Sequence, residues 1–102
     1  MKTHAYTYSY IPESMRLTER KLERMRGELI EAISRNLPFS KNDLSVLLPR
    51  ELYIIAARFG FLNGEEATLE AIGNSLGVTR QRVHYLLRRA LNRIRRLNQG
   101  MA

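Results

Sequence analysis

Apolar residues near the C-terminus of this chain recur at helical spacing. Leu69, Ile72 and Leu76 stand three and four apart, which predicts a helix. Gly77 follows, the residue type that most readily takes the left-handed conformation ending a helix. Thr79 is placed to cap a second helix with its hydroxyl. The stripe of that helix contains Val83, Leu86, Leu87, Ala90, Ile94 and Leu97. This pattern predicts a helix-turn-helix.

Helical geometry divides the second helix into two faces. At about 100° per residue, its apolar stripe spans an arc of about 100°. A polar arc of about 140° lies roughly opposite and contains Arg80, Gln81, His84, Tyr85 and Arg88. Recognition helices read the major groove with residues near their N-terminus, so these side chains are predicted to face DNA. The small Gly73 favours a close crossing of the two helices. The alternative is a plain helical hairpin with a solvated basic face.

An earlier helix is predicted over residues 14–36. Its apolar stripe is Leu22, Met25, Leu29 and Ile33, again at spacings of three and four. We expect this stripe to pack on the domain's own core. A homodimer through helix 14–36 is the alternative, because the seam resembles a short coiled coil.

Two shorter helices are predicted between these segments. Ser40 with Asp43 suits a capping box that opens a helix through Leu48, and Pro49 suits the first position of the next helix. Helix 50–59 is expected to end before Gly60 and to turn inward Leu52, Ile55, Ala56 and Phe59. The expected fold class is therefore all-α with about five helices.

Tyr6, Tyr8 and Tyr10 alternate with smaller residues before Pro12. A flexible tail over 1–12 is one interpretation, and a strand that docks on a partner's sheet edge is the other. The expected organisation is this tail, an N-terminal helix and connector over 13–45, and the helix-turn-helix domain over 46–102.

Composition limits the possible functions. The chain of 102 residues suits one domain, and it lacks an apolar run approaching the roughly 20 residues that cross a bilayer. It has no cysteine and two distant histidines, which makes a structural zinc site unexpected. No catalytic motif or glycine-rich phosphate loop is present, so a non-enzyme without cofactors is predicted. The expected location is the cytoplasm of a bacterial cell, at the nucleoid.

The net charge of +7 is concentrated near the C-terminus. Residues 1–70 contain ten basic and ten acidic residues, whereas residues 71–102 contain seven arginines and no acid. Such a distribution favours salt-dependent binding to the phosphate backbone of double-stranded DNA. An amphipathic membrane-surface helix is the weaker alternative.

Four fragments together resemble region 4 of the sigma-70 family of bacterial transcription initiation factors. They are LPRE (48–51), RFG (58–60), TLEAIG (68–73) and GVTRQR (77–82). They occur in the family's order and near its spacing, and the resemblance covers roughly Val46 to Leu97.

The resemblance implies that Arg80 and Gln81 contact the −35 promoter element. The family usually has glutamate where this chain has Gln81, arginine at His84 and glutamine at Tyr85, so a different preferred sequence is expected. Arg58, Arg89 and the amide end of the helix that starts near Leu69 match positions that resemble the family's phosphate anchors. Thr68, beside that helix start, and Thr79, the cap of the next helix, complete this group. The predicted DNA-binding set consists of these five with the polar face described above.

The resemblance also implies docking on the flap of the RNA polymerase β subunit. The candidates for this partner surface are Leu52, Ile55 and Phe59, although each is also a natural core residue. Leu87 stands where the family has glutamate, and we expect it in the core or, as the alternative, at a partner.

Two classes of function follow from the resemblance. The first is a small DNA-binding transcription regulator, free-standing and encoded by a phage or another mobile element, which contacts RNA polymerase or a sigma factor. The second is a protein-interaction module, a decoy or appropriator that occupies the flap with little sequence-specific DNA binding. An excised domain is a third interpretation, which the N-terminal methionine and the unfamiliar first 45 residues disfavour.

Overall fold

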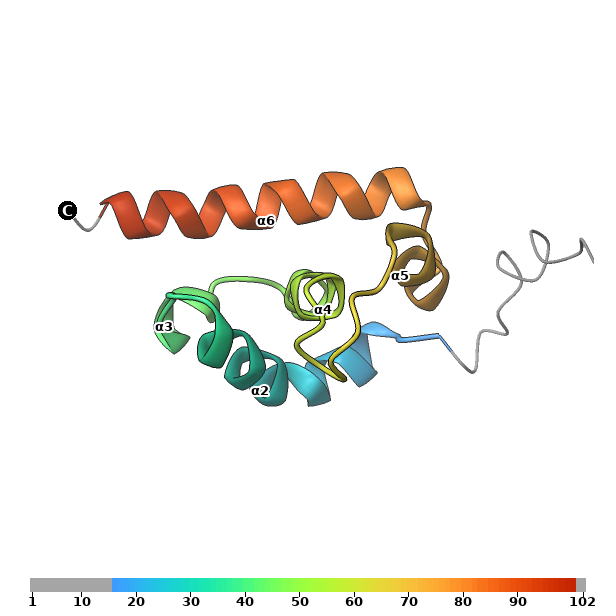
Figure 1. The fold of residues 1–102 in the computed structure, drawn as a ribbon, viewed down its shortest axis with the longest axis horizontal. Coiled ribbons are helices and arrows are strands. Elements are labelled where there is room, and N and C mark those ends of the chain that lie inside the picture. Colours follow the sequence, from blue (N-terminus) through green and yellow to red (C-terminus); the bar gives the residue numbers. More distant parts are fainter. Residues whose placement is uncertain (1–15, 101–102) are drawn as a thin grey trace, which may run out of the picture.

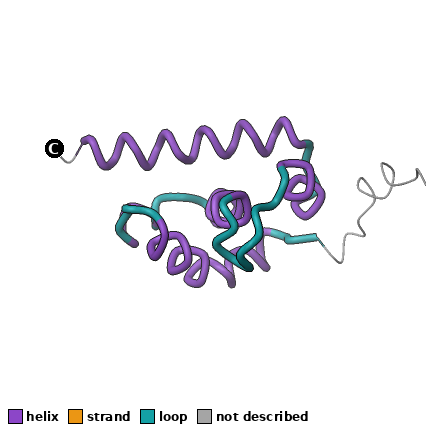
Figure 2. Tube along the Cα trace, in the orientation of Figure 1, coloured by secondary structure: helices purple, strands orange, loops and turns teal. Residues whose placement is uncertain are grey.

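The computed structural model describes residues 16–100, with side chains for 16–97. Five helices occupy this range (Figure 1): α2 (Glu19–Asn36), α3 (Lys41–Leu44), α4 (Pro49–Arg58), α5 (Leu69–Leu76) and α6 (Arg80–Gly100). Loops and turns connect them, and there is no strand within 16–100 (Figure 2). The predicted all-α class is therefore confirmed, while the predictions for tail 1–12 lie outside the described residues.

The helices form two layers around α4. The long helix α6 lies along one side of the molecule and α2 lies on the other, with α4 between them (Figure 1). Helix α5 packs under the N-terminal end of α6, and α3 lies near its C-terminal half. This arrangement leaves one long side of α6 uncovered by the other helices.

Helix α2 begins later than predicted. Thr18 is its N-cap, and the hydroxyl of Thr18 accepts a hydrogen bond from the Lys21 amide at 3.2 Å. Residues 16–18 are not helical, because a capping residue keeps extended backbone angles. The predicted start near residue 14 is therefore wrong for the described part, whereas the end at Asn36 is confirmed.

The apolar stripe of α2 packs on the chain's own core. Leu29 and Ile33 have no exposed surface and belong to the central cluster. Leu22 is also buried, and Met25 is partly buried against the same cluster. In this conformation the stripe is not available as a dimer seam.

Helix α3 is shorter than predicted. The Ser40 hydroxyl caps it by accepting from the Asp43 amide at 3.0 Å, but the helix ends at Leu44 and not at Leu48. Leu48 has extended backbone angles and is the N-cap of α4, which Pro49 opens as predicted. Since Leu48 must leave the helical conformation to start α4, α3 cannot continue to it.

An ion pair connects α3 to α2. The Lys41 ammonium lies 2.6 Å from a carboxylate oxygen of Glu31. This hydrogen bond and the charge of Lys41 lower the pKa of the Glu31 carboxyl. Both side chains are exposed, so the pair contributes little to stability.

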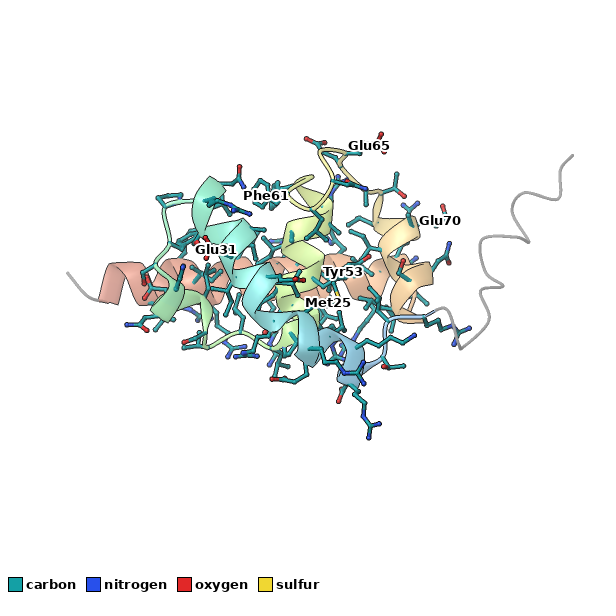
Figure 3. The ribbon with its side chains drawn as sticks, turned by 90° about the horizontal axis from the view of Figure 1, so that it is seen from below. Met25, Glu31, Tyr53, Phe61, Glu65 and Glu70 are labelled. Carbon is teal, nitrogen blue, oxygen red and sulfur yellow. The ribbon has the colours of Figure 1, made fainter. Side chains whose placement is uncertain are left out.

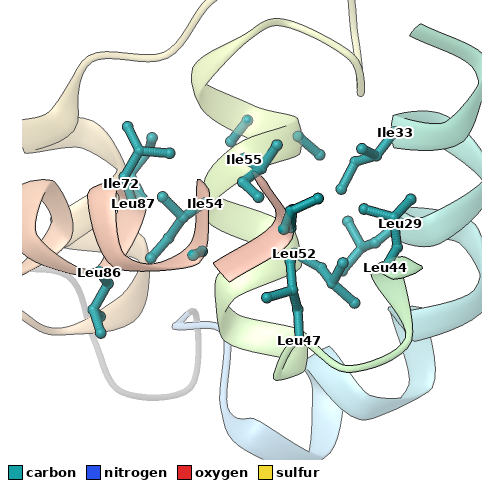
Figure 4. Packing of buried hydrophobic residues seen from close by; sticks show 14 of the residues in the cluster. Leu29, Ile33, Leu44, Leu47, Leu52, Ile54, Ile55, Ile72, Leu86 and Leu87 are labelled. Carbon is teal, nitrogen blue, oxygen red and sulfur yellow. The ribbon is translucent and has the colours of Figure 1, made fainter. Parts of the chain in front are cut away.

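The core fills the space between the two layers (Figure 4). Helix α4 is its centre, since Leu52, Ile54 and Ile55 all have 0% exposed surface. Side chains from every other helix surround them, among them Leu44 from α3 and Ile72 from α5. Full burial of each such aliphatic side chain stabilises the fold by about 1.5–3 kcal/mol relative to exposure.

Phe59 does not turn inward as predicted. It is the C-cap of α4 and remains 41% exposed. Because α4 ends at Arg58, helical spacing no longer determines its direction. Its ring stacks instead on Phe61, with the ring centroids 5.8 Å apart.

The turn between α5 and α6 has the predicted geometry. Gly77 ends α5 with φ of 77°, in the left-handed region. The Thr79 hydroxyl accepts from the Arg82 amide at 3.1 Å and so caps the start of α6. A Cβ atom on Gly73 would lie 2.5 Å from the Val78 carbonyl oxygen. Helix α5 therefore approaches the backbone of the turn to a distance that only glycine permits at this position.

Candidate nucleic-acid interface

The N-terminal half of α6 presents its polar face to solvent. Val83 and Leu86 are buried against the core, and this fixes the rotation of the helix. The opposite side chains are all exposed: Arg80, Gln81, His84, Tyr85 and Arg88. We call these five residues the α6 face. It coincides with the polar arc predicted from helical spacing.

Four of the predicted DNA-binding residues gather at the N-terminus of α6. Arg58, Thr68, Leu69 and Arg80 line one surface depression, together with Glu70 and Ala71. They come from α4, from the N-terminus of α5 and from α6, so only the tertiary structure brings them together. We call this depression the α5 depression.

Hydrogen bonds hold two residues of the α5 depression in place. The Arg58 guanidinium donates to the Ala67 carbonyl at 3.0 Å, which ties the end of α4 to the residue before the α5 cap. The Thr68 hydroxyl accepts from the Ala71 amide at 3.0 Å and caps α5. The first amide groups of α5 consequently lie beside a positioned cation, an arrangement suited to a phosphate.

A second depression follows α6 toward its C-terminus. Its lining residues are His84, Tyr85, Arg88, Arg89, Asn92 and Arg96. Arg89 therefore continues the surface of the α6 face, as its predicted phosphate-anchor role requires. Thr79 is exposed at the start of α6, where its hydroxyl serves as the cap.

The charge on this side of the molecule is almost entirely positive. No acid follows Glu70 in the sequence, so α6 carries arginines alone. Figure 3 views the molecule from the side opposite α6 and shows Glu31 on α2, Glu65 in the loop after α4 and Glu70 on α5. The two ion pairs of the described residues, Glu31–Lys41 and Glu51–Arg93, do not use an arginine of the α6 face.

Arg82 takes part in this surface, although the spacing did not select it. Its guanidinium carbon lies 5.4 Å from the centroid of the Tyr85 ring, within the range of a cation–π interaction. The two residues are three apart, so they are neighbours on the helix surface. That relation is the signal in the sequence by which Arg82 could have been found.

Arg93, in the C-terminal half of α6, makes its contacts with the protein itself. Its guanidinium lies 3.4 Å from a carboxylate oxygen of Glu51 and donates to the Val46 carbonyl at 3.0 Å. Glu51 is 1% exposed and also accepts from the Leu48 amide at 2.8 Å. A buried carboxylate needs such partners, so Arg93 connects α6 to the start of α4.

The predicted partner-binding residues fall into two groups. Leu52 and Ile55 are fully buried in the core, and Leu87 is 9% exposed within the same cluster. Burial makes Leu52 and Ile55 unable to touch a partner in this conformation, and Leu87 occupies the core position that we expected. Of these four residues only Phe59 presents a large apolar surface, and Leu62, three positions later in the chain, is exposed as well.

Other site types find little support in the described chain. No three histidine or acidic side chains within it are close enough to hold a metal ion. None of its helices combines the length and apolar character that crossing a membrane demands. The surface formed by the α6 face and the α5 depression is the strongest candidate site.

Comparison with known proteins points to the same part of the chain. Residues 44–96 match the family described as Sigma-70, region 4. The chain is similar to RNA polymerase sigma factor SigA of Microcystis aeruginosa, with 34% identity over 84 residues, covering 72% of this chain and 20% of that protein. No solved structure matches the chain significantly.

Two further relatives match a shorter stretch. RNA polymerase sigma factor SigA4 of Synechococcus elongatus is 41% identical over 56 residues, which cover 55% of this chain and 18% of that protein. The chloroplastic RNA polymerase sigma factor sigF of Arabidopsis thaliana is 42% identical over 55 residues, covering 54% and 10% respectively. The chain thus spans a fifth or less of the length of these relatives.

Proposed function

Since the chain belongs to the sigma-70 region 4 family, we propose that it is a DNA-binding transcription regulator that reads a promoter-like site with α6. In this proposal the chain binds and does not catalyse. Its partners are double-stranded DNA and bacterial RNA polymerase or a sigma factor, in the cytoplasm.

One observation carries this proposal. The side chains of the α6 face are exposed near the N-terminus of α6, while Val83 and Leu86 on the same turns are buried. A helix held in this way projects from the domain and fits a major groove about 12 Å wide. The excess of arginine over acid along α6 would attract the duplex from a distance.

The α6 face contains side chains that distinguish bases. Arginine commonly binds guanine with two hydrogen bonds, and glutamine binds adenine in the same manner. We therefore assign base contacts to Arg80 and Gln81, with Tyr85 against a thymine methyl group or a phosphate. His84 and Arg88 continue this face toward the backbone of the duplex.

Phosphate contacts fall to the edge of this surface. Arg58, Thr68, Leu69 and the first amides of α5 would hold one strand, because they line the α5 depression. Thr79 and Arg89 would contact the backbone beside the α6 face. Such contacts set the register of α6 on the duplex but carry no sequence information.

The test is selection from a pool of random duplex DNA at two salt concentrations. The wild-type chain should enrich a defined sequence. Arg80→Ala should lower affinity for that sequence by roughly 10- to 100-fold, since a bidentate arginine contributes about 1–3 kcal/mol of discrimination. Arg24→Ala on α2 is the matched control, because Arg24 is exposed on the layer opposite α6.

Two outcomes would overturn this proposal. One is binding without enrichment that high salt abolishes equally in the wild type and in Arg80→Ala. The other is enrichment of the same sequence with unchanged affinity by Arg80→Ala, which would remove the α6 face from the readout.

A second candidate function is supported by exposed apolar side chains at and just after the C-terminal end of α4. Phe59 and Leu62 are 41% and 43% exposed, close together in the chain after α4. In this alternative the chain docks on the flap of RNA polymerase and hardly needs DNA. Capture of purified polymerase that Phe59→Ala weakens and Arg80→Ala leaves intact would favour it.

A further inference from the structure

The segment before α2 is attached to the helix-turn-helix. The Leu17 amide donates to the Ser75 carbonyl at 2.8 Å, near the end of α5. The Lys21 ammonium donates to the Arg16 carbonyl at 3.2 Å. These two bonds hold Arg16 and Leu17 across the C-terminal end of α5. The segment lies outside residues 44–96, which match the family.

The Arg16 side chain lies over the turn between α5 and α6. A Cβ atom built on Gly77 would be 3.2 Å from Arg16 Nη1 and 3.3 Å from Arg16 Cδ. The absence of a side chain at Gly77 therefore leaves the space that the guanidinium occupies. Arg16, Thr79 and Arg80 line one surface depression, together with Glu70, Gly73, Asn74, Gly77 and Val78.

We propose that Arg16 is an additional phosphate-binding residue of the DNA interface, beside Arg80 at the N-terminus of α6. This inference rests on the proposed function. A recognition helix that enters the major groove brings its N-terminal end close to a backbone strand. A cation held at that end then meets a phosphate without contacting any base.

The chemistry of arginine suits this role. Its guanidinium carries five N–H donors in a fixed fork, so a group already held against the protein also has the geometry to grip a phosphate. Glu70 lines the same depression and opposes an anion there. Two guanidinium groups, those of Arg16 and Arg80, line this depression with that one carboxylate.

The test compares Arg16→Gln, Arg16→Lys and the wild type in DNA binding over a range of salt concentrations. The slope of log K against log salt is negative, and loss of one phosphate contact makes it less steep by about 0.9. The same loss weakens binding about tenfold near 0.1 M salt. We expect this result for Arg16→Gln, equally on the enriched site and on random duplex. Arg16→Lys keeps the charge and should retain most of the slope.

Arg20→Gln is the matched control. Arg20 lies four residues later, is exposed, and borders α4 and not the turn. The substitution Arg20→Gln removes the same charge from the chain as Arg16→Gln. Because Arg20 lies away from the turn, the salt slope of this variant should stay at the wild-type value. Thermal melting of each variant reports any structural role, since both Gln and Lys remove the contacts of the guanidinium with the protein.

The inference is overturned if Arg16→Gln has the wild-type salt slope. It is also overturned if the salt slope of Arg16→Lys becomes less steep by as much as that of Arg16→Gln. An equal loss of melting temperature in both variants, with unchanged slopes, would assign Arg16 to fold stability alone. Failure of the proposed function looks different, because Arg80→Ala would then also leave DNA binding unchanged. If Arg80→Ala weakens DNA binding but Arg16→Gln leaves both the affinity and the salt slope unchanged, only the role of Arg16 is rejected.

Discussion

Two glycines that both lie inside helices have very different surroundings. A Cβ atom on Gly73 would approach the Val78 carbonyl oxygen to 2.5 Å, whereas a Cβ on Gly27 would meet nothing within 4 Å. Gly73 thus permits the close approach of α5 to the turn before α6. Gly27 only costs helix propensity in α2. The same residue type is therefore required at one position and replaceable at the other.

Gly73→Ala should destabilise the chain by about 1–3 kcal/mol, because the neighbouring backbone must move to admit the methyl group. Gly27→Ala, its control, should stabilise the chain by about 0.5–1 kcal/mol. Urea denaturation measures both changes. Equal effects of the two substitutions would contradict this close approach at Gly73.

At the scale of the helices, the Glu51–Arg93 pair connects α6 to α4. The carboxylate is buried at the start of α4, and the guanidinium reaches it from the C-terminal half of α6. The same guanidinium binds the Val46 carbonyl in the loop between α3 and α4. One side chain therefore joins α6, α4 and this loop. Breaking a buried pair on one side leaves the other charge uncompensated.

Arg93→Met should lower the free energy of unfolding by about 1–3 kcal/mol, less than for a fully buried pair because Arg93 is partly exposed. Glu51→Gln should cost less, since an amide oxygen still accepts from the Leu48 amide. The double variant should lose less free energy of unfolding than the sum of the losses in the two single variants. The difference should be at least about 0.5 kcal/mol, as expected for residues in contact. Strict additivity in denaturation experiments would show that the two side chains do not interact. Arg95→Met serves as the exposed control on the same helix.

For the whole molecule, the important property is the different charge of the two helix layers on either side of the core. Helix α2 carries four acids beside its five bases, while α6 carries arginines with no acid. Helix α4 lies between the two layers and is apolar on the sides that meet them. Neutralising arginines on α6 and on α2 should therefore have different effects on DNA binding.

Arg88→Gln combined with Arg89→Gln should make the salt slope of DNA binding less steep by about 2, if each arginine neutralises one phosphate. Arg20→Gln combined with Arg24→Gln removes the same net charge from α2 and should leave the slope near its wild-type value. Binding titrations at several salt concentrations measure both. A similar decrease in the two double variants would mean that net charge matters and its position does not.

The sequence by itself determined the helix-turn-helix and the identity of the α6 face. Those features depend on interactions between residues a few positions apart: the Thr79 cap, the left-handed Gly77, and a helical period that places Val83 and Leu86 opposite Gln81 and Tyr85. Local chemistry of this kind is readable along the chain. The same reasoning misplaced the start of α2, where Thr18 is the cap, and the end of α3, because Leu48 leaves the helical conformation to start α4.

Only the tertiary structure decided which distant residues meet. Arg93 and Glu51 are 42 positions apart, and their spacing contains no periodic signal. The exposure of Phe59, the position of Arg16 over Gly77 and the gathering of Arg58 with Arg80 likewise depend on how the helices cross. Helical periodicity defines the direction of a side chain relative to its own axis. The partner on another helix is selected by packing of the shared core.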